Sequence, residues 1–150
     1  MFSKACEYGI RATIFIAWHT SNKKRVNLKE IASEIGSPEA FTAKILQQLV
    51  RADVITSVKG ASGGFTLNTD TASTLMLSTL VAAIDGDAIY RSCGLGLTSC
   101  NAKEPCPMHA QFMLVREQLR TMLENTPITD LTEDYGEGLT YLKRTSLIQN

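Results

Sequence analysis

Three cysteines and one histidine stand close together in the second half of the chain. They follow the pattern Cys93-x6-Cys100-x5-Cys106-x2-His109, which places four metal-binding side chains within seventeen residues. Thiolates and a neutral imidazole bind zinc, iron and iron–sulfur clusters, and this short spacing lets one loop supply all four ligands. The sequence therefore predicts a metal or iron–sulfur site in this loop, which is typical of a sensor.

The composition indicates a cytoplasmic protein without a membrane partner. The 150-residue chain has no apolar run long enough to span a bilayer, and its N-terminus lacks the basic, apolar and small-residue pattern of a secretory signal. Because the cytoplasm is reducing, we expect the clustered cysteines to be metal ligands or redox groups rather than a disulfide framework. Cys6 stands apart in a helical pattern, so we expect it to be a small core residue.

Charge is distributed unevenly along the chain, although the formal net charge is zero. Residues 1–67 contain nine Lys or Arg against five Asp or Glu, whereas residues 68–150 contain six against ten. Since local positive charge attracts phosphate, the first half is the part expected to approach nucleic acid. The alternative class, a small enzyme such as a thiol oxidoreductase, has no support from a Cys-x-x-Cys, nucleophile-elbow, paired-carboxylate or phosphate-loop motif.

The first half has the pattern of a helix-turn-helix. The segment 2–20 has helical spacing of apolar residues, and Asn27 with Glu30 predicts a capping box at the start of a second helix. Gly36 is expected to end that helix, and Ser37 followed by proline is expected to cap a third. Two helices joined at one glycine form a helix-turn-helix.

The third helix of this pattern is expected to read DNA. Phe41, Ile45 and Leu49 recur at helical spacing and are expected to face inward. The opposite face is polar and slightly basic, and it consists of Ala40, Lys44, Gln47, Gln48 and Arg51.

A β-hairpin wing is predicted directly after these helices. The runs 54–58 and 65–67 predict two strands around a glycine-rich loop at 59–64. Its glycines permit positive φ and a close approach of the backbone to a DNA groove. The predicted fold class is mainly α with a small β-hairpin, and the winged helix-turn-helix domain is expected to span residues 1–86.

The region 87–131 is predicted to contain the cysteine loop and a dimerisation helix. Residues 107–125 have a helical apolar stripe, formed by Phe112, Val115, Leu119, Met122 and Leu123. Such a helix needs a partner, which is either the same helix of a second subunit or the first helix of its own chain. The region 132–150 is polar and is expected to be a flexible tail.

With these elements in place, the chain resembles the Rrf-type family of winged-helix bacterial regulators, which has IscR-like and NsrR-like members. The likeness covers about residues 1–131. It rests on residues 7–12, 41–49, 57–65 and 82–86 and on the cysteine loop. The resemblance implies a homodimer that binds a palindromic operator in double-stranded DNA, as a repressor, with the long helix pairing the subunits.

The resemblance also implies how the cysteine loop is used. Cys106 and His109 match the Cys-x-x-His of IscR-like proteins, which favours a 2Fe-2S cluster on Cys93, Cys100, Cys106 and His109. Glu7 matches an acidic position from which NsrR-like proteins take a ligand for the other subunit, which favours a 4Fe-4S cluster. Zinc, a cysteine redox switch and a cofactor-free protein with a protein partner are the alternatives. The cluster is expected to sense iron, redox or nitric oxide status.

DNA contacts are expected from the third helix, the wing and the N-terminus. The expected residues are Ala40 and Lys44 in the major groove, Lys59, Gly60, Gly63 and Gly64 in the minor groove, and Lys4 at a phosphate. Phe41 stands where relatives often have tyrosine, so a contact in the major groove and the inward position that its spacing predicts are alternatives. The family usually has arginine where this chain has Lys59, so we expect looser reading of the minor groove. The interval between Cys93 and Cys100 is one residue longer than in IscR-like relatives.

Overall fold

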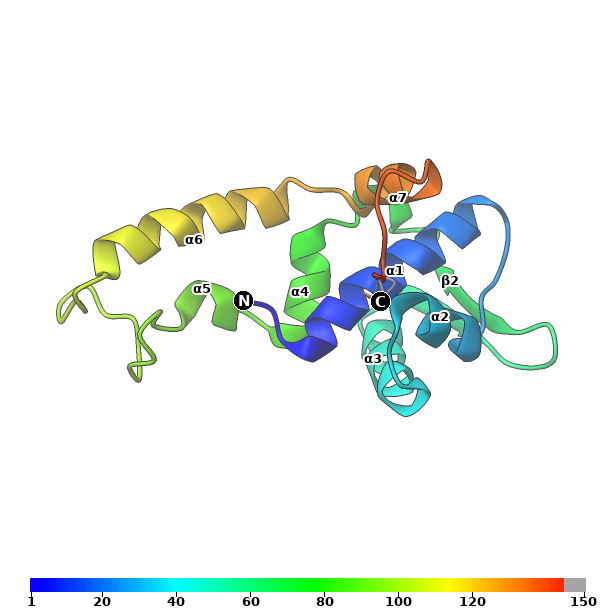
Figure 1. Ribbon diagram of the computed structural model, residues 1–150, viewed down its shortest axis with the longest axis horizontal. Coiled ribbons are helices and arrows are strands. Elements are labelled where there is room, and N and C mark those ends of the chain that lie inside the picture. The colour runs from blue at the N-terminus through cyan, green and yellow to red at the C-terminus, as the bar shows by residue number, and fades with distance from the viewer. Residues whose placement is uncertain (145–150) are drawn as a thin grey trace, which may run out of the picture.

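Helices form most of the molecule, and residues 1–144, which the structure describes, contain a single two-stranded antiparallel hairpin (Figure 1). The structure is a computed structural model. Its elements are α1 (Lys4–Ser21), α2 (Leu28–Ile35), α3 (Glu39–Arg51), β1 (Ile55–Val58), β2 (Gly64–Leu67), the short 3₁₀ helix η1 (Ala72–Thr74), α4 (Leu77–Asp85), α5 (Ala88–Arg91), α6 (His109–Glu124) and α7 (Ile128–Gly136). The predicted fold class is confirmed.

Helix α1 is the centre of the core. Its N-cap residue Ser3 accepts a hydrogen bond from the Cys6 amide at 3.0 Å, and its own amide donates to Asp85 at the end of α4 at 2.9 Å. Cys6, Ala12 and Ile16 are fully buried, and α1 contacts α2, α3, α4 and α7. Burial raises the pKa of the Cys6 thiol to about 12, so Cys6 is a protonated core residue, as predicted.

Local hydrogen bonds define the helix-turn-helix. The predicted capping box is confirmed, because the Glu30 amide donates to Asn27 at 2.9 Å and the Asn27 amide donates to Glu30 at 2.8 Å. Gly36 ends α2 with a φ of 66°. The predicted cap of α3 is wrong: the Ser37 amide donates to Ala32, which closes α2, and Pro38 occupies the N-cap position of α3.

The buried face of α3 is centred one residue later than the sequence predicts. Thr42, Ile45, Leu46 and Leu49 are buried, whereas Phe41 is half-buried and meets Tyr8 edge to face, with ring centroids 5.7 Å apart. Thr42 can lie inside because its hydroxyl donates to the Pro38 carbonyl at 2.9 Å. The predicted inward stripe is therefore correct for two of its three residues.

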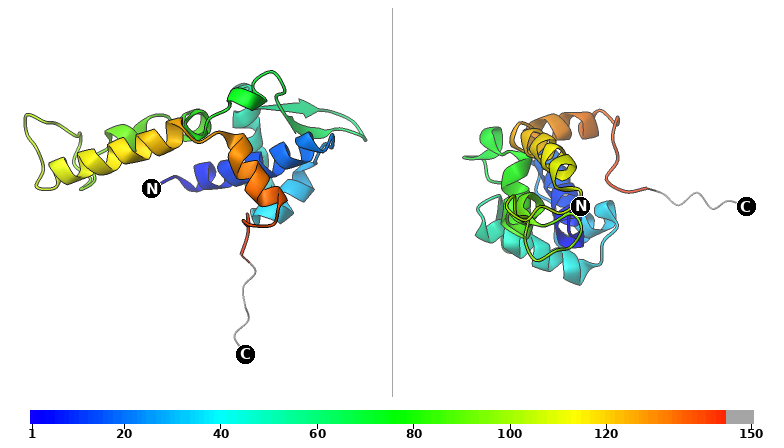
Figure 2. Two further views of the ribbon diagram at one scale, coloured as in Figure 1. Left: turned by 90° about the horizontal axis from the view of Figure 1, so that it is seen from above. Right: turned by 90° about the vertical axis from the view of Figure 1, so that its left-hand side faces the viewer.

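The predicted wing is confirmed. Strand β1 pairs with β2 from Ile55 opposite Leu67 to Val58 opposite Gly64. The Phe65 amide also donates to the Val26 carbonyl at 2.8 Å, which ties the hairpin to the segment before α2. The hairpin consequently projects from the body as a small, anchored sheet (Figure 2).

Helix α6 extends beyond the body as an arm, with α5 and the cysteine loop beside it (Figures 1 and 2). Leu123 at its inner end is fully buried and Leu119 packs against the core. Leu114, Val115 and Met122 are 71, 54 and 48% exposed. The predicted apolar stripe is thus divided between the chain's own core and an uncovered face. No helix within residues 1–144 is long and apolar enough to cross a membrane.

The predicted flexible tail at 132–150 differs from the structure in its first part. Residues 132–136 belong to α7, which packs on α1 through an apolar face that contains Ile128 and Tyr135. Leu142 is also buried, and its carbonyl accepts a hydrogen bond from Arg11 at 3.1 Å. The tail looks polar in sequence because acidic residues alternate with these apolar ones. Residues 145–150 of the predicted tail lie outside the described residues.

The environment of His19 predicts that the protein loses stability in mild acid. Its ring meets Phe15 and Trp18 edge to face, with centroids 4.5 and 4.7 Å apart, and burial lowers its pKa below the ordinary value of 6.5. The unfolded chain therefore binds this proton first, so the free energy of unfolding should fall as the pH drops through 6.5. Urea unfolding at about pH 7.5 and about pH 5.5 measures this, and His19→Gln should show a shallower decrease. An equal decrease in the free energy of unfolding for wild type and His19→Gln would contradict the assignment to His19.

Candidate DNA interface and cysteine loop

The exposed face of α3 carries basic side chains that are available to bind an anion. Ala40 and Lys44 are exposed near its N-terminal end, and Arg51 is exposed at its C-terminal end. The ion pairs within residues 1–144 join Lys4 to Glu7, Arg91 to Asp87 and Arg120 to Glu117, so they leave the α3 cations without a carboxylate. A shallow hollow between α3 and the wing, lined by residues that include Gln47 and Ser57, continues this surface toward β1.

The tip of the wing depends on glycine at three positions. Gly60 and Gly64 have φ values of 105° and 143°, which side chains rarely adopt. At Gly63 a Cβ atom would lie 2.2 Å from the Val58 carbonyl oxygen. The backbone of the wing is therefore bare and tightly folded, and Lys59 is exposed at its start.

Arg25 is a residue at the wing that the sequence reasoning missed. Its guanidinium donates to the Ser62 carbonyl at 3.3 Å, and with Lys23 and Lys24 it lines a basic hollow beside the wing. The run of three adjacent bases was visible in sequence, but only the fold places it against the wing loop. It adds positive charge to the surface formed by α3 and the wing.

Lys4 and Glu7 form an ion pair with each other, at 2.9 Å. The hydrogen bond between them raises the pKa of Lys4 and lowers the pKa of Glu7; Lys4 is exposed and Glu7 is half-buried. The predicted phosphate contact and the predicted oxygen ligand therefore neutralise one another in this chain. No three Cys, His, Asp or Glu among the described residues converge as metal ligands within one chain. The predicted role of Glu7 is at the cluster of the other subunit, and it stays a prediction.

Two of the four donors of the cysteine loop are in contact, because the Cys100 sulfur is 3.4 Å from Nδ1 of His109. The Cys106 side chain is near enough to Cys93 to help lower the pKa of its thiol. The loop folds against α6, where a Cβ atom on Gly94 would overlap the Phe112 ring. The predicted site residues are thus brought to one loop, although they do not converge on one point.

Arg116 is a second residue that sequence reasoning missed. It lies two turns after His109 on the same face of α6, and its guanidinium donates to the Cys100 sulfur at 3.0 Å. It also donates to the Ser92 carbonyl. Arg116 therefore ties the start and the middle of the loop to α6, and it places a positive charge beside a sulfur that carries negative charge as a thiolate.

The electrostatic environment of the loop suits thiolate ligands. Amide hydrogen bonds from Leu95 and Leu97, the Cys106 thiol and the charge of Arg116 hold the pKa of Cys93 below its ordinary value. Nε2 of His109 is buried and has no hydrogen-bond partner among the described residues. Three soft sulfurs and an unpaired ring nitrogen in one loop fit a transition metal or an iron–sulfur cluster in donor type.

The fold and these surfaces define a winged helix-turn-helix protein with a cysteine loop beside a long, partly uncovered helix. A family model described as Rrf2, iron-dependent transcriptional regulator, matches residues 2–134. The chain belongs to the Rrf2 family, and it is a transcriptional regulator rather than an enzyme.

Individual relatives agree with this assignment. The regulator IscR of Vibrio vulnificus is 27% identical over 127 residues, which cover 85% of this chain and 74% of that protein. Two solved structures share the fold. CymR of B. subtilis has a TM-score of 0.70 and 19% identity and covers 89% of this chain and 96% of its own, and IscR of T. potens has a TM-score of 0.70 and 20% identity and covers 93% and 91%.

Proposed function

We propose that this protein is a homodimeric regulator that binds a palindromic operator and responds to an iron–sulfur cluster held by Cys93, Cys100, Cys106 and His109. One observation carries the proposal: the ligand loop leads directly into α6, whose first residue is His109 and whose outer face is uncovered. A change in the loop therefore acts on the helix that pairs the subunits. We place this activity in the cytoplasm.

The proposed dimer contact uses the uncovered face of α6. Leu114, Val115 and Met122 are about half or more exposed on an arm that stands away from the body. Apolar side chains clustered on one helix face are stabilised by a matching face, and a symmetric pair of α6 helices supplies it. Pairing through this arm sets the separation of the two α3 helices, which must match successive major grooves of the operator.

The cluster we favour is 2Fe-2S, because a nitrogen donor lies within the loop itself. Such a group accepts or releases an electron, and an imidazole ligand raises its potential and can be protonated. In this chain Cys93 is already biased toward the thiolate, and Arg116 offsets negative charge at Cys100. Glu7 is the weaker candidate because it is paired with Lys4. A 4Fe-4S cluster and zinc remain as alternatives.

A thiol switch is the second candidate. It is favoured by the lowered pKa of Cys93, to which the nearby Cys106 side chain contributes, and by the free state of both cysteines. A peroxide would oxidise these two thiols to a disulfide, with loss of two protons and two electrons from the sulfurs and reduction of the peroxide to water. CymR, which shares the fold, is described as a global cysteine regulator. Anaerobic purification distinguishes the candidates, because iron and sulfide with visible absorption support the cluster, whereas colourless protein that loses two thiols on peroxide treatment supports the switch.

The wing assignment predicts a change in salt dependence. Lys59→Ala should weaken binding to duplex DNA and reduce the slope of log affinity against log salt by about 0.9, which corresponds to one lost phosphate contact. Lys103→Ala, in the cysteine loop, is the matched control and should change neither quantity. Fluorescence anisotropy across a salt series measures both, and an unchanged slope for Lys59→Ala would contradict the assignment.

A further inference from the structure

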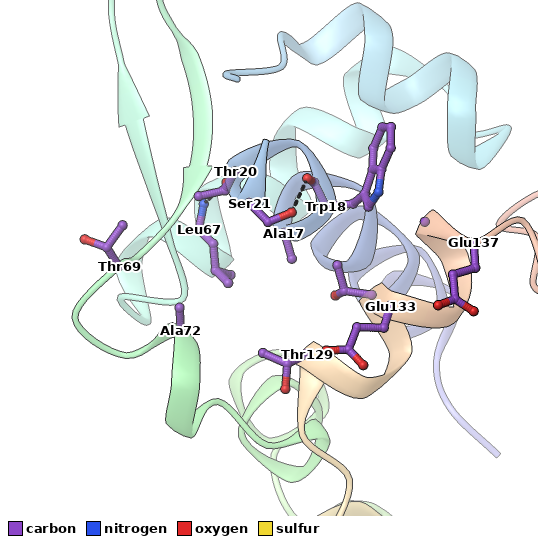
Figure 3. A pocket seen from close by; sticks show the side chains of 12 residues that line it. Ala17, Trp18, Thr20, Ser21, Leu67, Thr69, Ala72, Thr129, Glu133 and Glu137 are labelled. Carbon is purple, nitrogen blue, oxygen red and sulfur yellow. Dashed lines mark hydrogen bonds between the residues drawn. The ribbon is translucent and has the colours of Figure 1, made fainter. Parts of the chain in front are cut away.

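A cavity lies between the end of α1, strand β2, η1 and α7 (Figure 3). Its volume is about 580 Å³. Small-molecule sites commonly have volumes of roughly 300 to 1,000 Å³, so this cavity has room for one small ligand. Neither the exposed face of α3 nor the cysteine loop contributes a residue to its lining, and the proposed function does not use it.

The inner wall of the cavity is apolar. Ala17, Leu67 and the Trp18 indole supply carbon surface. Three of the five hydroxyls that line the cavity already donate to carbonyls of their own helices: Thr20 to Ile16 at 2.8 Å, Ser21 to Trp18 at 2.7 Å and Thr132 to Ile128 at 2.7 Å. An occupant must therefore offer mainly an apolar body to this wall, because burial of apolar surface is the gain available there.

The charged residues at the edge of the cavity are all acidic. Glu133 lies in the last turn of α7 and Glu137 directly follows that helix. Both are exposed, and Figure 3 shows them along one side of the cavity with Thr129. No Lys, Arg or His is among the lining residues, and neither glutamate takes part in an ion pair within residues 1–144. The C-terminal end of α7 adds negative potential at the same place.

We propose that this cavity binds a small organic cation, with an apolar body against Trp18 and Leu67 and an ammonium group at Glu133 and Glu137. The apolar wall and the unpaired carboxylates together select this class over an anion or a fully polar molecule. The cavity also touches the wing, because Leu67 belongs to β2 and its amide donates to Thr20 at 2.8 Å. A ligand that contacts α1, β2 and α7 together is placed to affect how the wing is held.

The binding test uses three probes that share one apolar body: phenylbutylamine, phenylbutanol and phenylbutyrate. Trp18 is the only tryptophan of the chain and lines the cavity, so its fluorescence reports occupancy without DNA or cofactor. The test therefore stands apart from the proposed function. We expect a saturable change with the amine, at an affinity about fivefold above that of the alcohol, and weakest binding of the acid.

Matched variants locate the binding site. Glu133→Gln with Glu137→Gln should reduce the affinity of the amine to that of the alcohol, whereas Asp134→Asn, on the same helix but outside the lining, should leave it unchanged. Ala72→Leu fills the cavity from η1 and should abolish binding, whereas Ser73→Leu on the exposed neighbour should not. No saturable change with any probe, equal affinity for amine and acid, or wild-type affinity in the glutamine variant would each overturn the proposal.

Discussion

Cys106→Ser should yield a protein that has lost nearly all of its cluster iron. The serine hydroxyl stays protonated at neutral pH and is a hard oxygen donor, so it cannot replace a thiolate that bridges iron and the protein. Iron and acid-labile sulfide analysis of anaerobically purified protein should fall from stoichiometric to background levels, with loss of visible absorption.

Cys6→Ala is the matched control for this experiment. Cys6 is fully buried in α1, and its raised pKa keeps the thiol protonated at neutral pH. Its removal should leave iron, sulfide and the visible spectrum unchanged. Full iron content in Cys106→Ser, or equal loss in both variants, would contradict the ligand assignment.

Leu46→Ala should lower the free energy of unfolding by about 2 to 5 kcal/mol. Leu46 is 0% exposed on the inner face of α3, within the same core as α1 and α4, so truncation removes buried carbon surface and leaves a cavity where three helices meet. A domain of this size has roughly 5 to 15 kcal/mol of stability in total, so the loss should be a large share of it. Urea unfolding measures the change.

Leu139→Ala provides the comparison for Leu46→Ala. Leu139 is 66% exposed, so its truncation should alter the free energy of unfolding by less than about 0.5 kcal/mol. Both variants must be compared with wild type at one protein concentration, because the proposed dimer would make apparent stability depend on concentration. If Leu46→Ala changed the free energy of unfolding only slightly and left its dependence on urea concentration unchanged, α3 would not be stabilised by this core.

The sequence predicts well those features that neighbouring residues determine. The capping box of Asn27 and Glu30, the end of α2 at Gly36 and the wing between two β-branched segments all depend on residues a few positions apart. Ser37 shows the limit of such patterns. A serine before a proline favours a side-chain cap, but Pro38 occupies the N-cap position of α3 and the Ser37 hydroxyl makes no cap hydrogen bond. Local patterns cannot tell how the end of one helix shifts the start of the next.

The features that the sequence could not predict depend on contacts between distant residues. Arg11 donates to the carbonyls of Ile35 and Leu142, at 3.0 and 3.1 Å. These two hydrogen bonds hold the C-terminal segment against the end of α2. In the same way, the cysteine pattern identifies the donors, but only the fold places the Arg116 guanidinium and Nδ1 of His109 beside the Cys100 sulfur. The roles of the DNA-facing residues and of the ligands stay predictions until they are measured.

One comparison tests the central claim most directly: the affinity of the protein for duplex DNA with its cluster in place and after its iron has been removed. A duplex selected in vitro with anaerobically purified protein serves as the operator, and anisotropy at fixed salt gives both dissociation constants. We expect the two constants to differ by about 5- to 150-fold, the usual range of coupling between two sites. Equal affinity in the two states would contradict control by the cysteine loop, and the absence of duplex binding in both would contradict the DNA-binding assignment itself.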